Sequence, residues 1–154
     1  MSENKSKIFF NRKAKYNYEI IQKFEAGLVL SGNEIRSIRE GKVVLENSYA
    51  VLKKNELWIL NLFVDLKSFK NSKFENQDDV RPKKLLLTRK QIDKIAQILR
   101  ANNFTVIPFD LHFNKKGFLK VNIAISKGRK KEDLREYKKQ QDWKREKQRM
   151  ERKG

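Results

Sequence analysis

Apolar and polar positions alternate most regularly along residues 119–125 of this chain. Leu, Val or Ile occupies every second position there, and a period of two residues predicts a strand that buries one face. Weaker strand patterns cover residues 49–52, 57–64 and 105–113. A further pattern covers residues 17–30 and predicts either one strand or two strands broken near Ala26–Gly27, where Gly tolerates a bend or bulge.

Two short patterns of Ser or Thr followed by Glu or Gln predict the starts of helices. Residues 31–34 and 88–91 each form a capping box, in which both side chains satisfy free amide groups of the first turn. The first predicts a short helix over 33–39 that Gly41 ends. The second predicts a helix over 89–101, because apolar residues recur there at helical intervals.

Polar segments between these patterns predict the connections. Residues 53–56 predict a hairpin loop, and Pro108 predicts an edge strand or a bulge within its strand. Residues 65–83 combine few apolar residues with many polar ones, which predicts a long mobile loop. Residues 1–10 are expected to be a flexible N-terminal segment.

These elements together predict the fold class and the organisation of the chain. Short strands joined by hairpins favour a mainly β fold with one or two helices. A closed β-barrel like the oligonucleotide-binding (OB) fold combines few strands with an inserted helix. We therefore expect an OB-fold-like barrel over residues 11–126 and a separate tail over residues 127–154.

The tail changes the picture because it is strongly basic and has little to bury. It carries 13 Lys or Arg and 6 Asp or Glu, and it contains no Pro. The whole chain of 154 residues has a formal net charge of +18, which is far more than solubility requires. A basic segment that can form a helix without a core predicts disorder in isolation and ordering on a polyanion.

Composition argues against several classes of protein. No apolar run approaches about 18 residues, so no membrane span is expected, and the N-terminal MSENKSK lacks the apolar centre of a signal peptide. The absence of Cys excludes disulfides and thiolate metal sites, and a single His cannot form a His-based zinc site. A cytoplasmic RNA- or DNA-binding protein without metal or cofactor is the first interpretation.

The residues offer little for catalysis. The chain has no phosphate-binding Gly-rich loop and no Cys nucleophile, and its Ser residues have only His112 as an imidazole base. The strand pattern around His112 favours a structural or surface role for it. Asp78 and Asp79 could hold a divalent cation, but their place in a polar loop favours solvation. We therefore expect binding rather than bond chemistry.

Lys and Arg gather in four clusters: Arg12, Lys13 and Lys15; Arg36 and Arg39; Arg81, Lys83 and Lys84; and Lys127 to Lys131. Arg36 and Arg39 are three residues apart and so share one side of the short helix. Each cluster alone is typical of a solvated surface. Together, on a chain of this charge, they indicate phosphate contacts, which bind without reading base sequence and weaken steeply with salt.

Aromatic and polar residues among these charges suggest contacts with unpaired bases. Tyr137 and Trp143 lie in a tail that has no core of its own, and bases stack on exposed rings. Asn11 can present a donor and an acceptor to a base or ribose, or it can cap a helix. Glu25, an acid on a basic protein, can accept from a base N–H or a 2′-hydroxyl, or it can pair with the arginines of the short helix.

Several motifs resemble the SsrA-binding protein family. They are, in chain order, Asn11-Arg12-Lys13-Ala14, Phe24-Glu25-Ala26-Gly27-Leu28, Gly32-x-Glu34-x-x-Ser37-Ile38-Arg39-x-Gly41, Asn47-Ser48-Tyr49, Arg81-x-x-Lys84-Leu85-Leu86-Leu87, Lys120-Val121 and Ala124-x-Ser126-Lys127-Gly128-Arg129-Lys130. Trp143 falls where many members carry an aromatic residue. The resemblance covers about residues 8–150, and this many motifs in order are far more specific than any one of them.

The resemblance implies an OB-type barrel that binds the tRNA-like domain of transfer-messenger RNA. It implies a role in trans-translation, which rescues stalled bacterial ribosomes and tags the unfinished peptide. The tail would become helical in the empty mRNA channel, at the decoding centre of the small ribosomal subunit and against its rRNA. Elongation factor Tu would be a partner only indirectly, through the charged RNA. A generic ribosome-associated protein that binds rRNA or tRNA is the alternative.

Candidate contact residues come from the matched motifs and the basic clusters. On the barrel they are Asn11, Arg12, Lys13, Glu25, Arg36, Arg39, Leu86, Thr88 and Lys120. On the tail they are Lys127, Gly128, Arg129, Lys130, Asp133, Arg135, Tyr137 and Trp143. The chain departs from the family pattern at Glu132-Asp133-Leu134-Arg135, where members often have His or Tyr before Asp-Lys-Arg, and at Thr88, where Asn is frequent.

Overall fold

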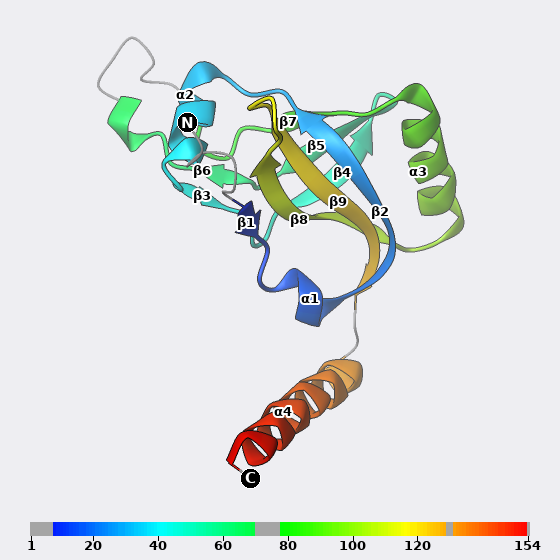
Figure 1. Ribbon diagram of the computed structural model, residues 1–154. Helices are drawn as coiled ribbons and strands as arrows, with labels where there is room; N and C mark the ends of the chain where they lie inside the picture. Colours follow the sequence, from blue (N-terminus) through cyan, green and yellow to red (C-terminus); the bar gives the residue numbers. More distant parts are fainter. Residues whose placement is uncertain (1–7, 70–77, 129–130, 154) are drawn as a thin grey trace.

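The computed structural model describes residues 8–69, 78–128 and 131–153. They form a β-barrel with helices on two sides and a long helix that projects away from it (Figure 1). The strands are β1 (Ile8–Phe10), β2 (Tyr18–Leu28), β3 (Val43–Val44), β4 (Tyr49–Lys53), β5 (Glu56–Leu60), β6 (Phe63–Val64), β7 (Lys83–Leu86), β8 (Thr105–Phe113) and β9 (Leu119–Gly128). The helices are α1 (Ala14–Asn17), α2 (Gly32–Arg39), α3 (Arg89–Ala101) and α4 (Lys131–Lys153), with a short 3-10 helix at Lys67–Phe69.

The strand pairings close into a ring. Hydrogen-bonded neighbours follow the order β8, β4, β5, β7, β2 and β9, and β9 pairs again with β8. The predicted mainly β fold is therefore confirmed, and the pairings make the barrel closed. Within the described residues the ring has six strands, one more than the usual OB barrel, and α3 lies between β7 and β8 in the chain.

Apolar side chains from alternate strand positions fill the barrel. Leu57, Ile59, Leu85, Val121 and Ile123 are each 0% exposed, as expected for strands with one inward face. Helices α2 and α3 lie on opposite sides of the barrel (Figure 1). Each contributes an apolar side chain to the same core, Ile38 and Ile95, which are also 0% exposed.

Both predicted capping boxes are confirmed. The Ser31 hydroxyl accepts from the Glu34 amide at 3.2 Å, and the Glu34 carboxylate accepts from the Ser31 amide at 2.8 Å. Thr88 and Gln91 make the same reciprocal pair at 3.2 and 3.0 Å. The helices α2 and α3 therefore begin directly after Ser31 and Thr88, as the sequence pattern predicts.

Two irregularities were predicted in the strands, and one is confirmed. The pairing register shifts between Pro108 and Asp110 in β8, where Pro108 predicts a bulge. In β2 the shift lies between Ile20 and Gln22. Residues 18–28 form one strand, so the alternative of a single strand is confirmed and that of two strands broken near Ala26–Gly27 is wrong. Gly27 has another role, because a Cβ atom there would lie 3.2 Å from the Cβ atom of Leu86.

The expected flexible N-terminus is wrong for its last three residues. Ile8–Phe10 forms β1, which pairs antiparallel with β8 opposite Asp110–His112. Phe9 packs against the core. The pairing partner lies about a hundred residues away in the chain, so no local pattern predicts it. The rest of the expected segment, residues 1–7, lies outside the described residues.

The predicted long loop over 65–83 is held at both ends. Asp79 accepts a hydrogen bond from the Leu66 amide at 3.2 Å, and Lys83 already belongs to β7. Before the loop, β6 pairs with β3 in a separate two-stranded sheet. The middle of the predicted loop, residues 70–77, lies outside the described residues.

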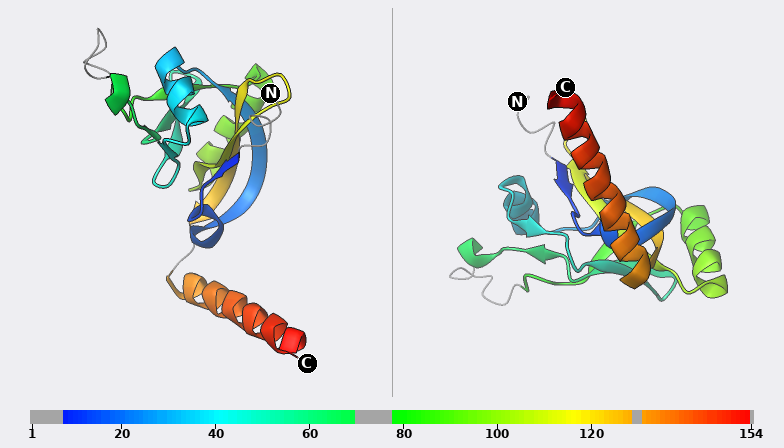
Figure 2. Two further views of the ribbon diagram at one scale, coloured as in Figure 1. Left: turned by 60° about the vertical axis from the view of Figure 1, so that its left-hand side comes forward. Right: turned by 90° about the horizontal axis from the view of Figure 1, so that it is seen from below.

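The tail forms the helix α4, which extends away from the barrel and approaches it at α1 (Figures 1 and 2). Lys127 and Gly128 belong to β9, opposite Glu19 and Tyr18 of β2, so the tail begins after Gly128 rather than at Lys127. The structure has a helix at Lys131–Lys153, and the predicted helical conformation on the ribosome stays a prediction. Its disorder in isolation stays a prediction.

Candidate nucleic-acid interface

Three neighbouring strands bring Leu86, Gly27 and Lys120 into one row. Gly27 of β2 lies opposite Leu86 of β7 on one side and opposite Lys120 of β9 on the other. Cross-strand neighbours share a face of the sheet, and Leu86 is 52% exposed, so this face points outward. Because Gly27 has no side chain, Leu86 can lie directly over β2.

The next positions along the same face carry a polar cluster. Glu25 lies opposite Asn122, which lies opposite Asp110. The Asn122 amide donates to both oxygens of Asp110, at 3.2 and 3.1 Å. His112 lies with Nδ1 2.8 Å from Asp110 and Nε2 3.7 Å from Glu25. We call Glu25, Gly27, Leu86, Asp110, His112, Lys120 and Asn122 the outer face.

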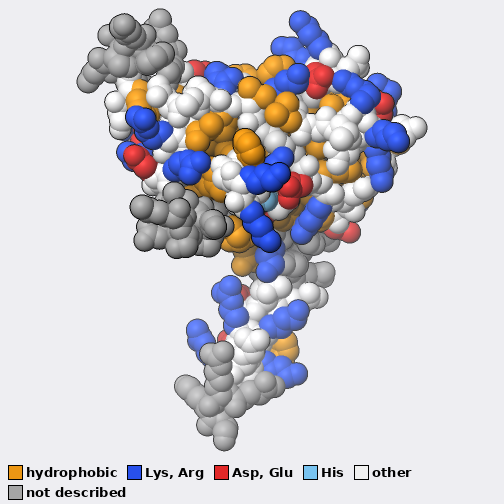
Figure 3. Space-filling model, turned by 45° about the horizontal axis from the view of Figure 1, so that its top comes forward, with side chains coloured by type: hydrophobic (Ala, Val, Ile, Leu, Met, Phe, Trp, Pro, Cys, Tyr) orange, Lys and Arg blue, Asp and Glu red, His pale blue; other side chains and the backbone are white. Residues whose placement is uncertain are grey.

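The outer face joins an anion, a cation and an apolar side chain within one surface. Figure 3 shows Lys and Arg side chains interspersed with exposed hydrophobic side chains on the face of the molecule that it presents. Of the residues predicted from the sequence, Glu25, Leu86 and Lys120 meet here, from three strands. The sequence did not identify three other residues of this face, Asp110, His112 and Asn122. The available signal was their alternation within the predicted strands, because residues two positions apart in a strand lie on the same face.

Two further predicted residues lie at helix ends on opposite sides of the barrel. Thr88 is separated from β7 only by Leu87, is exposed, and caps α3. The guanidinium of Arg39 lies 4.6 Å from the centre of the Phe113 ring and donates to the Gly117 carbonyl at 3.4 Å. This cation–π contact fixes the head group near the β8–β9 turn. Arg36 is exposed on the same helix, α2.

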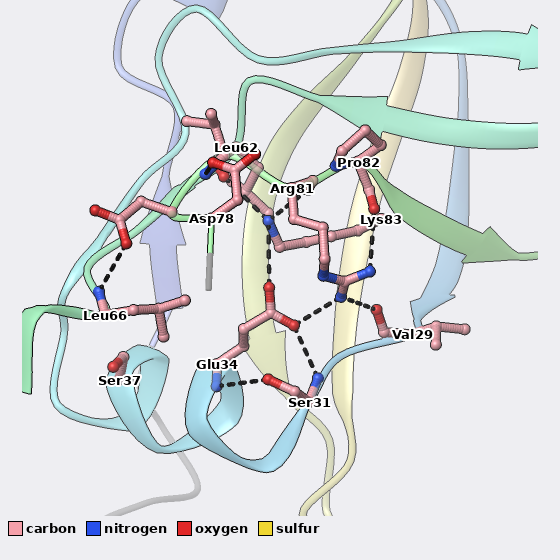
Figure 4. Close-up of polar contacts among 12 residues, drawn as sticks. Val29, Ser31, Glu34, Ser37, Leu62, Leu66, Asp78, Arg81, Pro82 and Lys83 are labelled. Carbon is pink, nitrogen blue, oxygen red and sulfur yellow. Dashed lines mark hydrogen bonds and ion pairs between the residues drawn. The ribbon is translucent and has the colours of Figure 1, made fainter. Parts of the chain in front are cut away.

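The third basic cluster contains one buried residue, Lys83. The side chain of Lys83 is 0% exposed and donates to the carbonyls of Leu62 at 3.2 Å and Arg81 at 2.9 Å. Its ammonium lies 3.6 Å from Glu34, and Arg81 donates to the same carboxylate at 2.7 Å (Figure 4). The prediction that Lys83 contacts phosphate is therefore wrong, because the ammonium is buried against Glu34.

Burial and charge act in opposite directions on this cluster. Burial by itself would raise the pKa of Glu34, but hydrogen bonds from Arg81 and the Ser31 amide, with the nearby positive charges, lower the pKa below its ordinary value. Burial lowers the pKa of Lys83, and the facing Glu34 carboxylate offsets only part of that effect. The carboxylate thus stays charged and joins α2 to β7.

The residues Asn11, Arg12 and Lys13 lie at a different end of the barrel, beside α1. Asn11 is only 8% exposed, its backbone amide donates to the Phe109 carbonyl at 2.7 Å, and its side chain donates to the Pro108 carbonyl at 2.9 Å. The side-chain donor is thus used within the fold, and an RNA contact through Asn11 stays a prediction. Arg12 and Lys13 are exposed next to it.

The predicted tail residues are placed to different degrees. Trp143 lies on α4 and is 64% exposed, although it is a large apolar side chain. Asp133, Arg135 and Tyr137 lie within the same helix, for which only their backbone is described, and Arg129 and Lys130 lie outside the described residues. The predicted contact of this exposed ring with another molecule stays a prediction.

Among the residues that the structure describes, no group of three or more His, Cys, Asp or Glu side chains is placed to hold a metal ion. No helix in the described ranges is both long enough and apolar enough to cross a membrane.

The chain is similar to known proteins over nearly its whole length. Residues 8–153 match the family model described as SmpB protein. The SsrA-binding protein of Ehrlichia ruminantium (strain Gardel) is 46% identical over 96% of this chain and 98% of the relative. That of Ehrlichia canis (strain Jake) is 45% identical over 93% and 95%, and that of Rhodopseudomonas palustris (strain TIE-1) is 41% identical over 91% and 88%.

A solved structure gives the same picture for the fold. It is described as "tmRNA-SmpB: a journey to the center of the bacterial ribosome", and it matches with a TM-score of 0.65 and 30% sequence identity over 84% of this chain and 92% of that one. The family match includes both the barrel with its outer face and the projecting helix α4. The chain therefore belongs to the SmpB protein family, in which the relatives above are SsrA-binding proteins.

Proposed function

We propose that this chain binds the tRNA-like domain of transfer-messenger RNA and delivers it to stalled ribosomes for trans-translation and peptide tagging. The observation that carries the proposal is the convergence of Glu25, Leu86 and Lys120 on one outer face. These residues come from three strands and from separate motifs that resemble the SsrA-binding proteins. The names of the similar proteins and of the similar structure support the same RNA and the ribosome as partners.

Each part of the outer face suits one component of a folded RNA. The Lys120 ammonium can contact a phosphate, which positions the RNA without reading its sequence. The exposed side chain of Leu86 offers an apolar surface for a base that is not stacked within a helix. The Glu25 carboxylate repels phosphate, but it accepts hydrogen bonds from a base N–H or a 2′-hydroxyl. The combination favours binding of a folded RNA with a defined surface over binding of any other polyanion.

The tail would bind the ribosome rather than the tRNA-like domain. Helix α4 carries basic residues on a segment with no core of its own, and Trp143 is exposed on it. A helix with this composition suits a channel whose walls are rRNA, where phosphates neutralise its charge. In this proposal it occupies the empty mRNA channel at the decoding centre. The protein acts in the cytoplasm by binding alone, and it meets elongation factor Tu only through the charged RNA.

A competition experiment tests the proposed selectivity. Labelled tRNA-like domain is bound to the purified chain, and unlabelled bulk tRNA is added in large excess in a gel-shift assay. We expect the complex to survive, because the outer face combines specific acceptors with phosphate contacts. Equal competition by bulk tRNA would instead support the alternative, a generic protein that binds rRNA or tRNA. Recovery of bound RNA from cells gives the same comparison without a chosen competitor.

A further inference from the structure

A second basic surface lies beside α3, and the proposed function does not use it. A groove of about 440 Å³ runs between α3 and the β4–β5 turn. Its floor includes Leu52, Ile92 and Ala96, and Ile92 and Ala96 are only 3% and 7% exposed. The charged residues along its rim are mainly Lys and Arg, so the groove is both hollow and cationic.

The cations of this groove fall into two groups. Arg89 is occupied, because it donates to Glu56 at 3.0 Å and to the Asn55 carbonyl at 2.8 Å. Lys90, Lys94 and Arg100 are exposed, and none of the three has an ion-pair partner among the described residues. Three Lys and Arg side chains without an ion-pair partner therefore line the groove, together with the exposed carboxylate of Asp93, which lies 4.0 Å from Arg89. Arg81 and Lys83, by contrast, both face the carboxylate of Glu34.

The spacing of these cations suits an extended polyanion. From Lys90 to Arg100 the helix rises about 15 Å, and each strand of a DNA duplex carries one phosphate for about every 3.4 Å of the helix axis, so several phosphates fit within this length. The groove begins at the N-terminus of α3, directly after Thr88, which is one of the candidate RNA contacts. An RNA bound on the outer face could continue past Thr88 into the groove beside α3.

We infer that the groove beside α3 binds a second stretch of RNA backbone, through its phosphates and without reading base sequence. The inference rests on the proposed function, since it extends the surface offered to the same class of ligand. No aromatic ring lines the groove, so base stacking is not part of the interaction. The contacts are electrostatic, and each phosphate neutralised adds about 0.7 to 0.9 to the slope of log affinity against log salt.

A pair of charge-matched variants tests the inference. Lys94→Gln/Arg100→Gln removes two charges from the groove, and Lys67→Gln/Lys116→Gln removes two exposed charges that have no ion-pair partner among the described residues. Lys67 lies on the 3-10 helix and Lys116 on the β8–β9 turn next to Arg39 of α2, and α2 lies on the opposite side of the barrel from α3 (Figure 1). Gln is as good a helix former as Lys or Arg, so the groove variant should fold, and thermal unfolding followed by circular dichroism verifies this. Binding of purified transfer-messenger RNA is then measured across a range of salt concentrations.

The expected result is a difference between the two variants. The groove variant should lose about 1.5 from the salt slope and bind several-fold more weakly at low salt, whereas the control should keep nearly the wild-type slope. Equal slopes for the two variants would overturn the inference, because net charge alone would then explain the effect. The proposed function is judged separately, since loss of selectivity against bulk tRNA in the wild-type chain refutes that function whatever the slopes are.

Discussion

His112 Nε2 lies 3.7 Å from a carboxylate oxygen of Glu25, across the strands β8 and β2. The other ring nitrogen lies 2.8 Å from Asp110, which also accepts from Asn122. The imidazole is thus held by its own strand and limits how the Glu25 side chain can turn. This arrangement presents an exposed anion beside His112 on a strongly basic protein, although a surface that attracted RNA by charge alone would carry no anion there.

The first prediction concerns Glu25 itself. Glu25→Ala should weaken binding of the tRNA-like domain about tenfold, because a charge-assisted hydrogen bond to the RNA is lost. Filter binding at fixed salt measures the change. Glu19→Ala is the matched control, since Glu19 is exposed on the same strand and carries the same charge. A purely electrostatic surface would bind more tightly in both variants, and that result would refute the specific role of Glu25.

The second prediction concerns His112 as a positioning residue. His112→Ala should weaken RNA binding less than Glu25→Ala does, since the carboxylate remains but turns more freely. The double variant should cost less than the sum of the two single changes, because contacting residues do not act additively. A double-mutant cycle on the binding free energy measures this coupling. Fully additive effects would show that His112 acts independently of Glu25.

The third prediction concerns the close approach of Leu86 to β2. In Gly27→Ala the new Cβ atom would lie 3.2 Å from the Leu86 Cβ atom, so Leu86 must shift. Because Leu86 is half exposed, we expect little change in the free energy of unfolding but a several-fold loss in RNA affinity. Gly32→Ala is the control, because nothing lies within 4 Å of a Cβ atom there. Unchanged RNA affinity in Gly27→Ala would argue against Leu86 as a contact.

The fourth prediction concerns the buried ion cluster of Glu34 and Lys83. Glu34→Gln should lower the free energy of unfolding by about 3 kcal/mol or more, because it leaves the ammonium of Lys83 buried without a countercharge. Glu56→Gln makes the same chemical change in a partly exposed pair with Lys84 and Arg89, so its cost should be about 1 kcal/mol or less. Urea unfolding of both variants makes the comparison, and equal losses would contradict it.

The same cluster gives a pH dependence with a defined sign. The folded-state pKa of Glu34 is lowered, so the unfolded chain takes up a proton first as the pH falls. The stability that Glu34 contributes is complete above the ordinary Glu pKa of about 4.3 and is lost as the pH falls through the lowered value. Wild-type stability should decline over this range more steeply than that of Glu34→Gln. Parallel pH profiles of the two proteins would refute the assignment.

Local chemistry decides which parts of the fold can be predicted from the sequence. Both capping boxes and the strand over 105–113 depend on residues within a few positions of each other, and the structure agrees with each. The strands β1 and β3 are three and two residues long, so they carry almost no periodic signal. They exist because distant segments, β8 and β6, supply their hydrogen-bond partners.

The sequence also predicts only part of the candidate site, because the pairing of distant strands decides which residues meet there. Family motifs located Glu25, Leu86 and Lys120, but the pairing register alone brings them together and adds Asp110, His112 and Asn122. The misjudged residue was Lys83, because the flanking Arg81, Pro82 and Lys84 are typical of a solvated basic loop. Its burial depends on Glu34, which lies far away in the chain and is itself fixed by a helix cap.

The last prediction separates the barrel from the tail. A chain that ends at Gly128 keeps all of β9, including the pairing of Gly128 with Tyr18, so its barrel should fold. It should bind the tRNA-like domain selectively but fail to support peptide tagging on stalled ribosomes, because the segment proposed for the mRNA channel is missing. Gel shifts and a reconstituted tagging assay measure the two properties, with Trp143→Ala in the full chain as a milder change. Normal tagging by the shortened chain would overturn the role proposed for α4.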